Sequence, residues 1–215
     1  MSQRPDWDVI IDLIPAGTRI LELGCGDGSL LAQFLAHKAI FARGVEKNEE
    51  NVRACVANGF SVRHGDIEEG LADFANQAFE YVILSQTLGC LQNPIPVLRE
   101  MLRVARFGIV SFQNAGYWQD RFHVLAGRGA GNPLKSGLPL TRSITVFQFL
   151  DALTDLGLVV DRCIFLSGNR RVLVWPTLRA QTAVFMITAT TFPGNWADQI
   201  AKDKQTAELG QRLRN

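Results

Sequence analysis

Apolar positions in the first half of the chain follow two alternating patterns. Short strand-like runs occupy residues 19–23, 40–45, 61–64, 79–84 and 107–112. The first alternates little between apolar and polar residues and the fourth is apolar except for Glu80, which is typical of strands buried on both faces of a sheet. The segments between these runs place apolar residues three and four positions apart, the spacing of one helix face. Strands that alternate with helices predict an α/β fold with a doubly wound, Rossmann-like parallel sheet.

Further elements are predicted at both ends of this pattern. Asp6 is expected to cap a first helix that runs through Ile14. Residues 143–156 are predicted as a helix, and residues 158–166 and 172–175 as two strands joined by a short turn. This antiparallel C-terminal hairpin would complete a seven-stranded, mostly parallel sheet.

Residues 113–143 break both patterns, because glycine and proline are concentrated between positions 127 and 139. Long connections inside compact domains are typically functional or flexible. This one would begin near the carboxyl ends of the strands, where ligands bind in doubly wound folds. We therefore expect a lid or a crossover insertion at 113–143 within a domain of residues 1–178, followed by a C-terminal extension of residues 179–215.

A glycine-rich turn follows the first strand, with the sequence Glu22-Leu23-Gly24-Cys25-Gly26-Asp27-Gly28. Glycines between a strand and a helix let a ligand approach the backbone closely. At an effective dielectric near 20, like charges about 4 Å apart repel by roughly 4 kcal/mol, so Glu22 and Asp27 disfavour a pyrophosphate here. The G-x-G-x-G spacing also departs from the G-x-G-x-x-G of dinucleotide-binding turns, and no Lys-Ser or Lys-Thr pair completes a phosphate loop.

Two acids beside a glycine turn suit a ligand that carries positive charge. S-adenosylmethionine, with its sulfonium and amino groups, is such a ligand. Glu46 follows the second predicted strand about twenty residues beyond the turn, where an acid of this kind of fold meets ribose hydroxyls. We therefore expect S-adenosylmethionine as the cofactor and S-adenosylhomocysteine as its product.

The segment E-L-G-C-G-D-G resembles the first motif of class I S-adenosylmethionine-dependent methyltransferases. The resemblance implies their fold, and it places the acid after the third strand, Asp66, and its neighbour Ile67 around adenine. No metal is expected. The cofactor-binding residues expected on these grounds are Glu22, Gly24, Cys25, Gly26, Asp27, Gly28, Glu46, Lys47, Asp66, Ile67 and Ser85.

Longer segments resemble the MetW family of methionine-biosynthesis proteins. They are G-D-I-E-E-G-L at 65–71, F-E-Y-V-I-L-S-Q-T-L at 79–88, V-L-R-E-M-L-R-V at 97–104 and I-V-S-F at 109–112, of which L-S-Q-T-L is the most specific. The similarity covers residues 10–168. It implies a methyltransferase-like fold and an association with homoserine O-acyltransferase in methionine synthesis, without a defined methyl acceptor.

Composition and charge argue against several other classes of protein. Of the 215 residues, 47% are apolar and 20% are charged, which is ordinary for a globular domain. The net charge is +1 and the basic residues are scattered, so no nucleic-acid partner is expected. The chain starts without a signal-like segment and has no run of about eighteen apolar residues, so we expect no membrane span and a cytoplasmic location. The four cysteines form no C-x-x-C pair and are expected to be free thiols.

Methyl transfer requires little from the protein beyond positioning, because the sulfonium already activates the methyl carbon. A general base is needed only if the acceptor carries a proton in its reactive form. Ser85, Gln86, Thr87 and Tyr117 face the expected pocket, and none is a strong base. The catalytic residue is therefore left unassigned.

Two functions of different classes stay open. The first is an enzyme that methylates a small-molecule acceptor, and the full set of expected cofactor contacts supports it. The second is an accessory protein that regulates or assists a homoserine O-acyltransferase. Small-molecule enzymes of this fold often carry a histidine after the fourth strand, where this chain has Gly89, Cys90 and Leu91, and that difference favours the second function. An NAD-dependent oxidoreductase is disfavoured by the glycine spacing, and a homodimer is left open.

Overall fold

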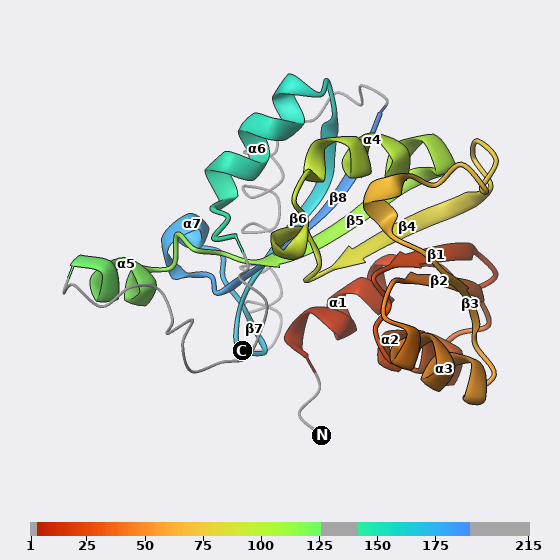
Figure 1. Cartoon of the computed structure of the whole chain (residues 1–215). Coiled ribbons are helices and arrows are strands. Elements are labelled where there is room, and N and C mark those ends of the chain that lie inside the picture. The colour runs from red at the N-terminus through yellow and green to blue at the C-terminus, as the bar shows by residue number, and fades with distance from the viewer. Residues whose placement is uncertain (1–3, 126–141, 190–215) are drawn as a thin grey trace.

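The structure is a computed structural model that describes residues 4–125 and 142–189 (Figure 1). Eight strands and seven α-helices are assigned in these ranges, together with two short 3-10 helices, η1 (Ile67–Glu69) and η2 (Leu88–Cys90). In chain order the other elements are α1 (Pro5–Leu13), β1 (Arg19–Leu23), α2 (Ser29–His37), β2 (Phe41–Glu46), α3 (Glu49–Ala57), β3 (Ser61–His64), β4 (Phe79–Ser85), α4 (Pro94–Val104), β5 (Ala105–Gln113), α5 (Trp118–Leu125), α6 (Val146–Asp155), β6 (Val159–Ser167), β7 (Arg170–Arg171), α7 (Pro176–Arg179) and β8 (Thr182–Thr188).

The strands form one sheet in the order β3-β2-β1-β4-β5-β8-β6-β7. The first five strands are parallel, as the apolar runs predicted, and β1 and β3 have the predicted bounds. The order of the strands in the sheet changes direction at β1: β2 and β3 follow on one side of it, and β4 and β5 on the other. A doubly wound fold binds its ligand at such a switch point, in the crevice at the carboxyl ends of β1 and β4.

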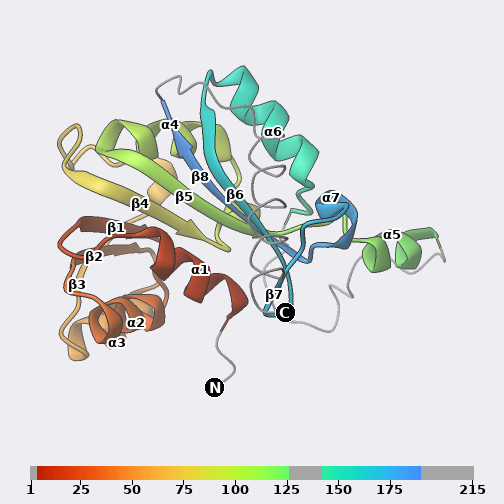
Figure 2. The same ribbon diagram turned by 180° about the vertical axis from the view of Figure 1, so that it is seen from behind.

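Helices cover both faces of the sheet (Figures 1 and 2). α1, α2 and α3 lie on one face, and α4 and α6 on the other. The apolar sides of α4 and α6 join the larger core cluster, while α1 and α2 pack into a second one. This arrangement confirms the predicted doubly wound α/β fold. None of the helices in the described ranges is both long and apolar enough to cross a membrane.

The end of the sheet differs from the expected hairpin. Residues 172–175 form no strand, and β6 pairs instead with the two-residue β7 and with β8, which lies between β5 and β6. Residues 182–188 are apolar or threonine throughout and buried, as a strand covered on both faces requires, whereas residues 172–175 lead directly into Pro176. The boundary predicted after residue 178 is therefore too early, and the sheet has eight strands rather than seven. Residues 190–215 of the expected extension lie outside the described part of the chain.

The expected lid or crossover is described only at its two ends. α5 projects away from the sheet and exposes Trp118 and Phe122 (Figures 1 and 2). A β-bridge between Asn114 and Ile144 brings the far end of the segment back to the carboxyl end of β5. Residues 126–141 lie outside the described ranges, so the lid stays a prediction.

Candidate functional site

The glycine turn lies at the carboxyl end of β1 and is tied to the end of β2. Gly24, Gly26 and Gly28 have φ values of +69°, +56° and +80°, a conformation that side-chain-bearing residues rarely adopt. The Oε2 atom of Glu46 accepts a hydrogen bond from the backbone N–H of Gly26 at 2.9 Å, and Oε1 accepts one from Asn48 at 2.8 Å. Glu46 therefore fixes the shape of the turn while its carboxylate lies at the edge where the strands end.

A cavity of about 140 Å³ opens beside this turn. Five expected residues line it, and the neighbouring Thr87 and Cys90 close it from the segment after β4. Val45, Gly65 and Leu91 were not expected at the site; the first two precede expected site residues, and no motif indicates Leu91. The complete lining is Gly24, Val45, Glu46, Lys47, Gly65, Asp66, Ile67, Thr87, Cys90 and Leu91.

Asp66 and Lys47 form the polar rim of the cavity. One carboxylate oxygen of Asp66 accepts a hydrogen bond from the backbone N–H of Glu68 at 2.9 Å and so caps η1. The other lies 3.8 Å from the ammonium of Lys47, and both side chains are partly exposed. Ile67 is buried beneath them. This part of the cavity pairs an apolar surface with exposed hydrogen-bonding groups, as a nucleobase requires.

Two expected residues of the turn, Asp27 and Cys25, hold the local structure together. Asp27 is exposed, and its Oδ1 accepts hydrogen bonds from the backbone N–H and the hydroxyl of Ser29 at the start of α2. The side chain of Cys25 is buried in a small cluster with Leu31 and Cys55, and burial raises the pKa of its thiol. Its backbone N–H donates to Val45 and its carbonyl accepts from Gly28, so Cys25 shapes the turn and is not a reactive thiolate.

Glu22 is the acid of the site that is most deeply buried. Its side chain is 4% exposed, and Oε2 has no hydrogen-bond partner among the described residues. Burial raises the pKa of Glu22 to about 8, against the opposing charge of Arg4, and the neighbouring carboxylates Asp27, Asp6 and Glu46 add to the rise. The carboxyl group therefore holds its proton at neutral pH in the ligand-free protein.

The last expected residue, Ser85, is engaged by the first turn of α1. Its hydroxyl donates to Asp6 at 3.1 Å and accepts from the Arg4 guanidinium at 2.6 Å. Asp6 is 1% exposed and does not cap α1, whose N-cap residue is Arg4 without a side-chain bond. The predicted capping role of Asp6 is therefore wrong, because the serines at the ends of β4 and β5 draw its carboxylate under the helix.

We expect Gly28→Ala to destabilise the protein more than Gly59→Ala. Both glycines have nearly the same φ, +80° and +79°, so each substitution carries a left-handed backbone strain of about 1–2 kcal/mol. A Cβ at position 28 would also lie 2.6 Å from the Phe60 ring, whereas one at position 59 would meet nothing within 4 Å. This crowding adds about 1 kcal/mol or more at Gly28. Urea unfolding of the two variants measures the difference, and equal losses would show that the turn is not packed against Phe60.

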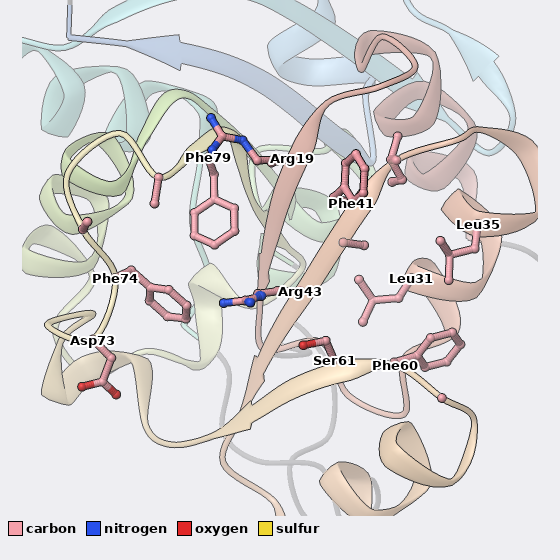
Figure 3. A pocket seen from close by; sticks show the side chains of 15 residues that line it. Arg19, Leu31, Leu35, Phe41, Arg43, Phe60, Ser61, Asp73, Phe74 and Phe79 are labelled. Carbon is pink, nitrogen blue, oxygen red and sulfur yellow. The ribbon is translucent and has the colours of Figure 1, made fainter.

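A second cavity of about 720 Å³ lies at the opposite end of the sheet (Figure 3). It is lined by the first residues of four strands, Arg19, Phe41, Ser61 and Phe79, and is largely apolar. Figure 3 shows the Arg43 side chain extending toward Phe74 inside it. None of the expected cofactor-binding residues contributes to its wall, so size alone does not make it the cofactor site.

The residues at the carboxyl edge of the sheet can bind and position a ligand, and they offer little for acid-base chemistry. Ser85 is held by Asp6, and the Thr87 hydroxyl donates to the Ser85 carbonyl at 3.1 Å. His64 Nε2 lies 3.1 Å from the carbonyl oxygen of Lys47. Within residues 4–125 and 142–189, no group of three or more His, Cys, Asp or Glu side chains is placed to hold a metal ion. In-line transfer to an acceptor that is already nucleophilic needs positioning and no general base.

Solved structures with the same fold are numerous. A possible histamine N-methyltransferase from Thermotoga maritima matches with a TM-score of 0.66 and 17% identity, over 86% of this chain and 88% of its own. A methyltransferase from Mesorhizobium loti matches with a TM-score of 0.65 and 17% identity, over 86% and 97% of the two chains. The [4+2]-cyclase SpnF also matches, with a TM-score of 0.64 and 16% identity, over 86% and 80%. These likenesses confirm the fold of the class I S-adenosylmethionine-dependent methyltransferases, and the cyclase shows that the fold alone does not fix the reaction.

The sequence itself is similar to proteins of methionine biosynthesis. A bifunctional MetXA/MetW protein from Rhodopirellula baltica is 35% identical over 200 residues, which cover 83% of this chain and 32% of that protein. This chain thus spans about a third of that relative. The family model described as methionine biosynthesis protein MetW matches residues 4–187, which include every described helix and strand except the last residue of β8. The chain therefore belongs to the MetW family of methionine-biosynthesis proteins.

Proposed function

We propose that this protein binds S-adenosylmethionine at the carboxyl edge of β1 and β2 and transfers its methyl group to a small molecule in methionine biosynthesis. The observation that carries the proposal is the 140 Å³ cavity in which Glu46, Asp66 and the glycine turn meet. Glu46 would accept hydrogen bonds from the ribose hydroxyls, and Asp66 with Ile67 would hold adenine. The unpartnered, buried Oε2 of Glu22 fits the cationic end of the cofactor. The cofactor would supply a methyl carbon made electrophilic by its sulfonium.

Glu46→Ala is expected to weaken the binding of S-adenosylhomocysteine tenfold or more, which corresponds to about 1.4 kcal/mol. The substitution removes the ribose acceptor and also releases the turn at Gly26. Glu49→Ala is a matched control, because Glu49 is an exposed glutamate at the start of α3 and outside the cavity. Isothermal titration calorimetry measures both dissociation constants, and equal affinities would contradict the role of Glu46.

Turnover is tested by the formation of S-adenosylhomocysteine from S-adenosylmethionine. The protein is incubated with the low-molecular-weight fraction of a cell extract, and the product is measured by chromatography. We expect product to accumulate with the native protein and much less with Glu46→Ala. If the native protein binds the cofactor and forms no product, the methyl-transfer part of the proposal is contradicted while the binding part stands.

A second candidate function is a regulatory or assisting partner of a homoserine acyltransferase. It is favoured by the relative in which MetXA and MetW are joined in one bifunctional protein. Proteins joined in one chain in one organism often form a complex when separate in another. The test is to mix this protein with the homoserine acyltransferase of the same organism and to measure co-elution and acyltransferase rate. A change in either supports the partner role, and no change in both contradicts it.

A further inference from the structure

The 720 Å³ cavity at the amino ends of the strands gathers apolar side chains that the solvent reaches (Figure 3). Phe41 on β2 is 72% exposed, and Leu35 on α2 is 51% exposed. Phe60, Phe74 and Phe79 add three more aromatic rings to the wall. Cavities of several hundred Å³ with largely apolar walls are typical of sites for small organic molecules. Large apolar side chains gathered around one hollow indicate a binding site, whereas residues exposed singly do not.

Two of the three charged side chains in the wall of this cavity are paired. Arg19 Nη2 donates to Glu80 at 2.7 Å, and Asp73 accepts a hydrogen bond from Arg63 Nε at 2.6 Å. The third, Arg43, is exposed, and its guanidinium has no carboxylate or hydrogen-bond partner among the described residues. The cavity therefore presents one positive charge that no neighbouring acid neutralises. Such a site favours an anionic ligand over a cationic or a neutral one.

Arg43 has a polar neighbour inside the cavity. Its side chain extends toward Phe74 (Figure 3), so the charge lies beside an aromatic wall. Arg43 on β2 is in register with Ser61 on β3, so the two side chains leave the sheet on one face, about 4.8 Å apart at the backbone. The Ser61 hydroxyl makes no hydrogen bond within residues 4–125 and 142–189. A guanidinium fork beside a free hydroxyl can bind both oxygens of one carboxylate.

We propose that this cavity binds a small monocarboxylate with an apolar body, in which Arg43 and Ser61 hold the carboxylate and the phenylalanine rings cover the apolar part. A phosphate carries up to two charges at neutral pH and needs more donors than one guanidinium and one hydroxyl, so a carboxylate fits better.

The proposed site is separate from the cofactor cavity. The linings of the two cavities, as far as the structure describes them, share no residue. Phe41 begins β2 and Glu46 ends it, and a strand rises about 3.3 Å per residue, so the two sites lie about 16 Å apart along β2. The inference therefore goes beyond the proposed function and does not depend on it.

The test compares three probes by titration of the isotope-labelled protein, followed by the NMR shifts of its backbone amides. Phenylpropionate carries an aromatic ring and a carboxylate, phenylpropanol has the same ring and chain without the charge, and inorganic phosphate has charge without an apolar body. We expect phenylpropionate to shift the amide signals of residues that line the cavity, among them Phe41 and Ser61. Its affinity should be about fivefold or more above that of phenylpropanol, and phosphate should bind more weakly than phenylpropionate.

Three variants separate the charge from the apolar wall. Arg43→Gln is expected to reduce the preference for phenylpropionate over phenylpropanol to about twofold or less, because it removes the charge and keeps most of the side chain. Phe41→Ala is expected to weaken both organic probes by a similar factor, since it removes part of the wall and leaves Arg43 in place. Arg53→Ala is the matched control and should bind all probes as the native protein does, because Arg53 is an exposed arginine on α3 that pairs with Glu49 outside the cavity. Amide signals that stay in place elsewhere show that each variant is folded.

The inference is overturned if phenylpropanol or phosphate binds the native protein as tightly as phenylpropionate, or if Arg43→Gln keeps the full preference. It is also overturned if no amide signal shifts with phenylpropionate at up to about 10 mM. Shifts confined to residues around Glu46 and Asp66 would place the probe in the cofactor cavity and overturn it as well. None of these outcomes bears on the binding of S-adenosylhomocysteine, which tests the proposed function by itself.

Discussion

Phe185→Ala is expected to lower the free energy of unfolding by about 3–5 kcal/mol. Phe185 lies in the middle of β8, the antiparallel strand between β5 and β6, and is 1% exposed. Its ring stacks on Phe112 with centroids 6.0 Å apart and packs against Phe149 at 5.0 Å and Phe165 at 5.8 Å. Truncation would leave a cavity that three other aromatic rings cannot fill without moving off their rotamers.

Urea unfolding and the melting temperature measure this effect, and a drop of roughly 10 °C is expected for a chain of this size. Phe41→Ala is the matched control, because Phe41 is 72% exposed at the start of β2 and should cost less than about 0.5 kcal/mol. A small loss for Phe185→Ala, comparable to that of Phe41→Ala, would contradict the placement of β8 in the sheet.

The stability of the ligand-free protein is expected to fall as the pH rises from about 5 to 8. Glu22 has a pKa of about 8 in the folded protein, against an ordinary value of 4.5. An acid with a raised pKa binds its proton more tightly when folded, so its contribution is fully present below pH 4.5 and is lost as the pH rises through 8. The slope is about 1 kcal/mol per pH unit, or roughly 3 kcal/mol over the range.

Glu22→Gln tests the source of this dependence, because glutamine keeps the shape of the side chain and does not ionise. Unfolding of both proteins is measured in urea at several pH values between about 5 and 8. The slope should be much smaller in Glu22→Gln than in the native protein. The lowered pKa of Asp6 acts in the opposite sense, and only in more acidic solution, below its ordinary value of 3.8. Equal slopes in the two proteins would mean that Glu22 is not buried in its protonated form.

Local sequence was enough to predict the parallel half of the sheet. β1 and β3 have the predicted bounds, and β2, β4 and β5 differ from theirs by a few residues at most. These strands are short apolar runs between turns, so the pattern along the chain is the same as the pattern of burial. β8 was missed as a strand because residues 172–175, just before it, resembled the second arm of a hairpin. Only tertiary packing decides whether residues 172–175 or residues 182–188 join the sheet.

Part of the lining of the cavity was predictable in the same way. Glu46, Lys47 and Asp66 with its neighbour Ile67 follow directly after strands, so their common edge follows from a parallel sheet, and together with Gly24 they line the cavity. Arg4 and Asp6 were not predicted, because their partner Ser85 lies about eighty residues away and an acid at the start of a helix suggests a cap. Nothing in the local sequence indicates that the first residues of α1 contact the ends of β4 and β5.

The measurement that tests the account most directly is calorimetric titration of the native protein with S-adenosylhomocysteine. The proposed cofactor site, at the cavity lined by Glu46 and Asp66, predicts one site per chain with micromolar affinity. The same titration of Glu46→Ala should show at least about a tenfold weaker affinity. No heat of binding together with no shift of the melting temperature, for this ligand and for S-adenosylmethionine, would contradict the central claim that the carboxyl edge is a cofactor site.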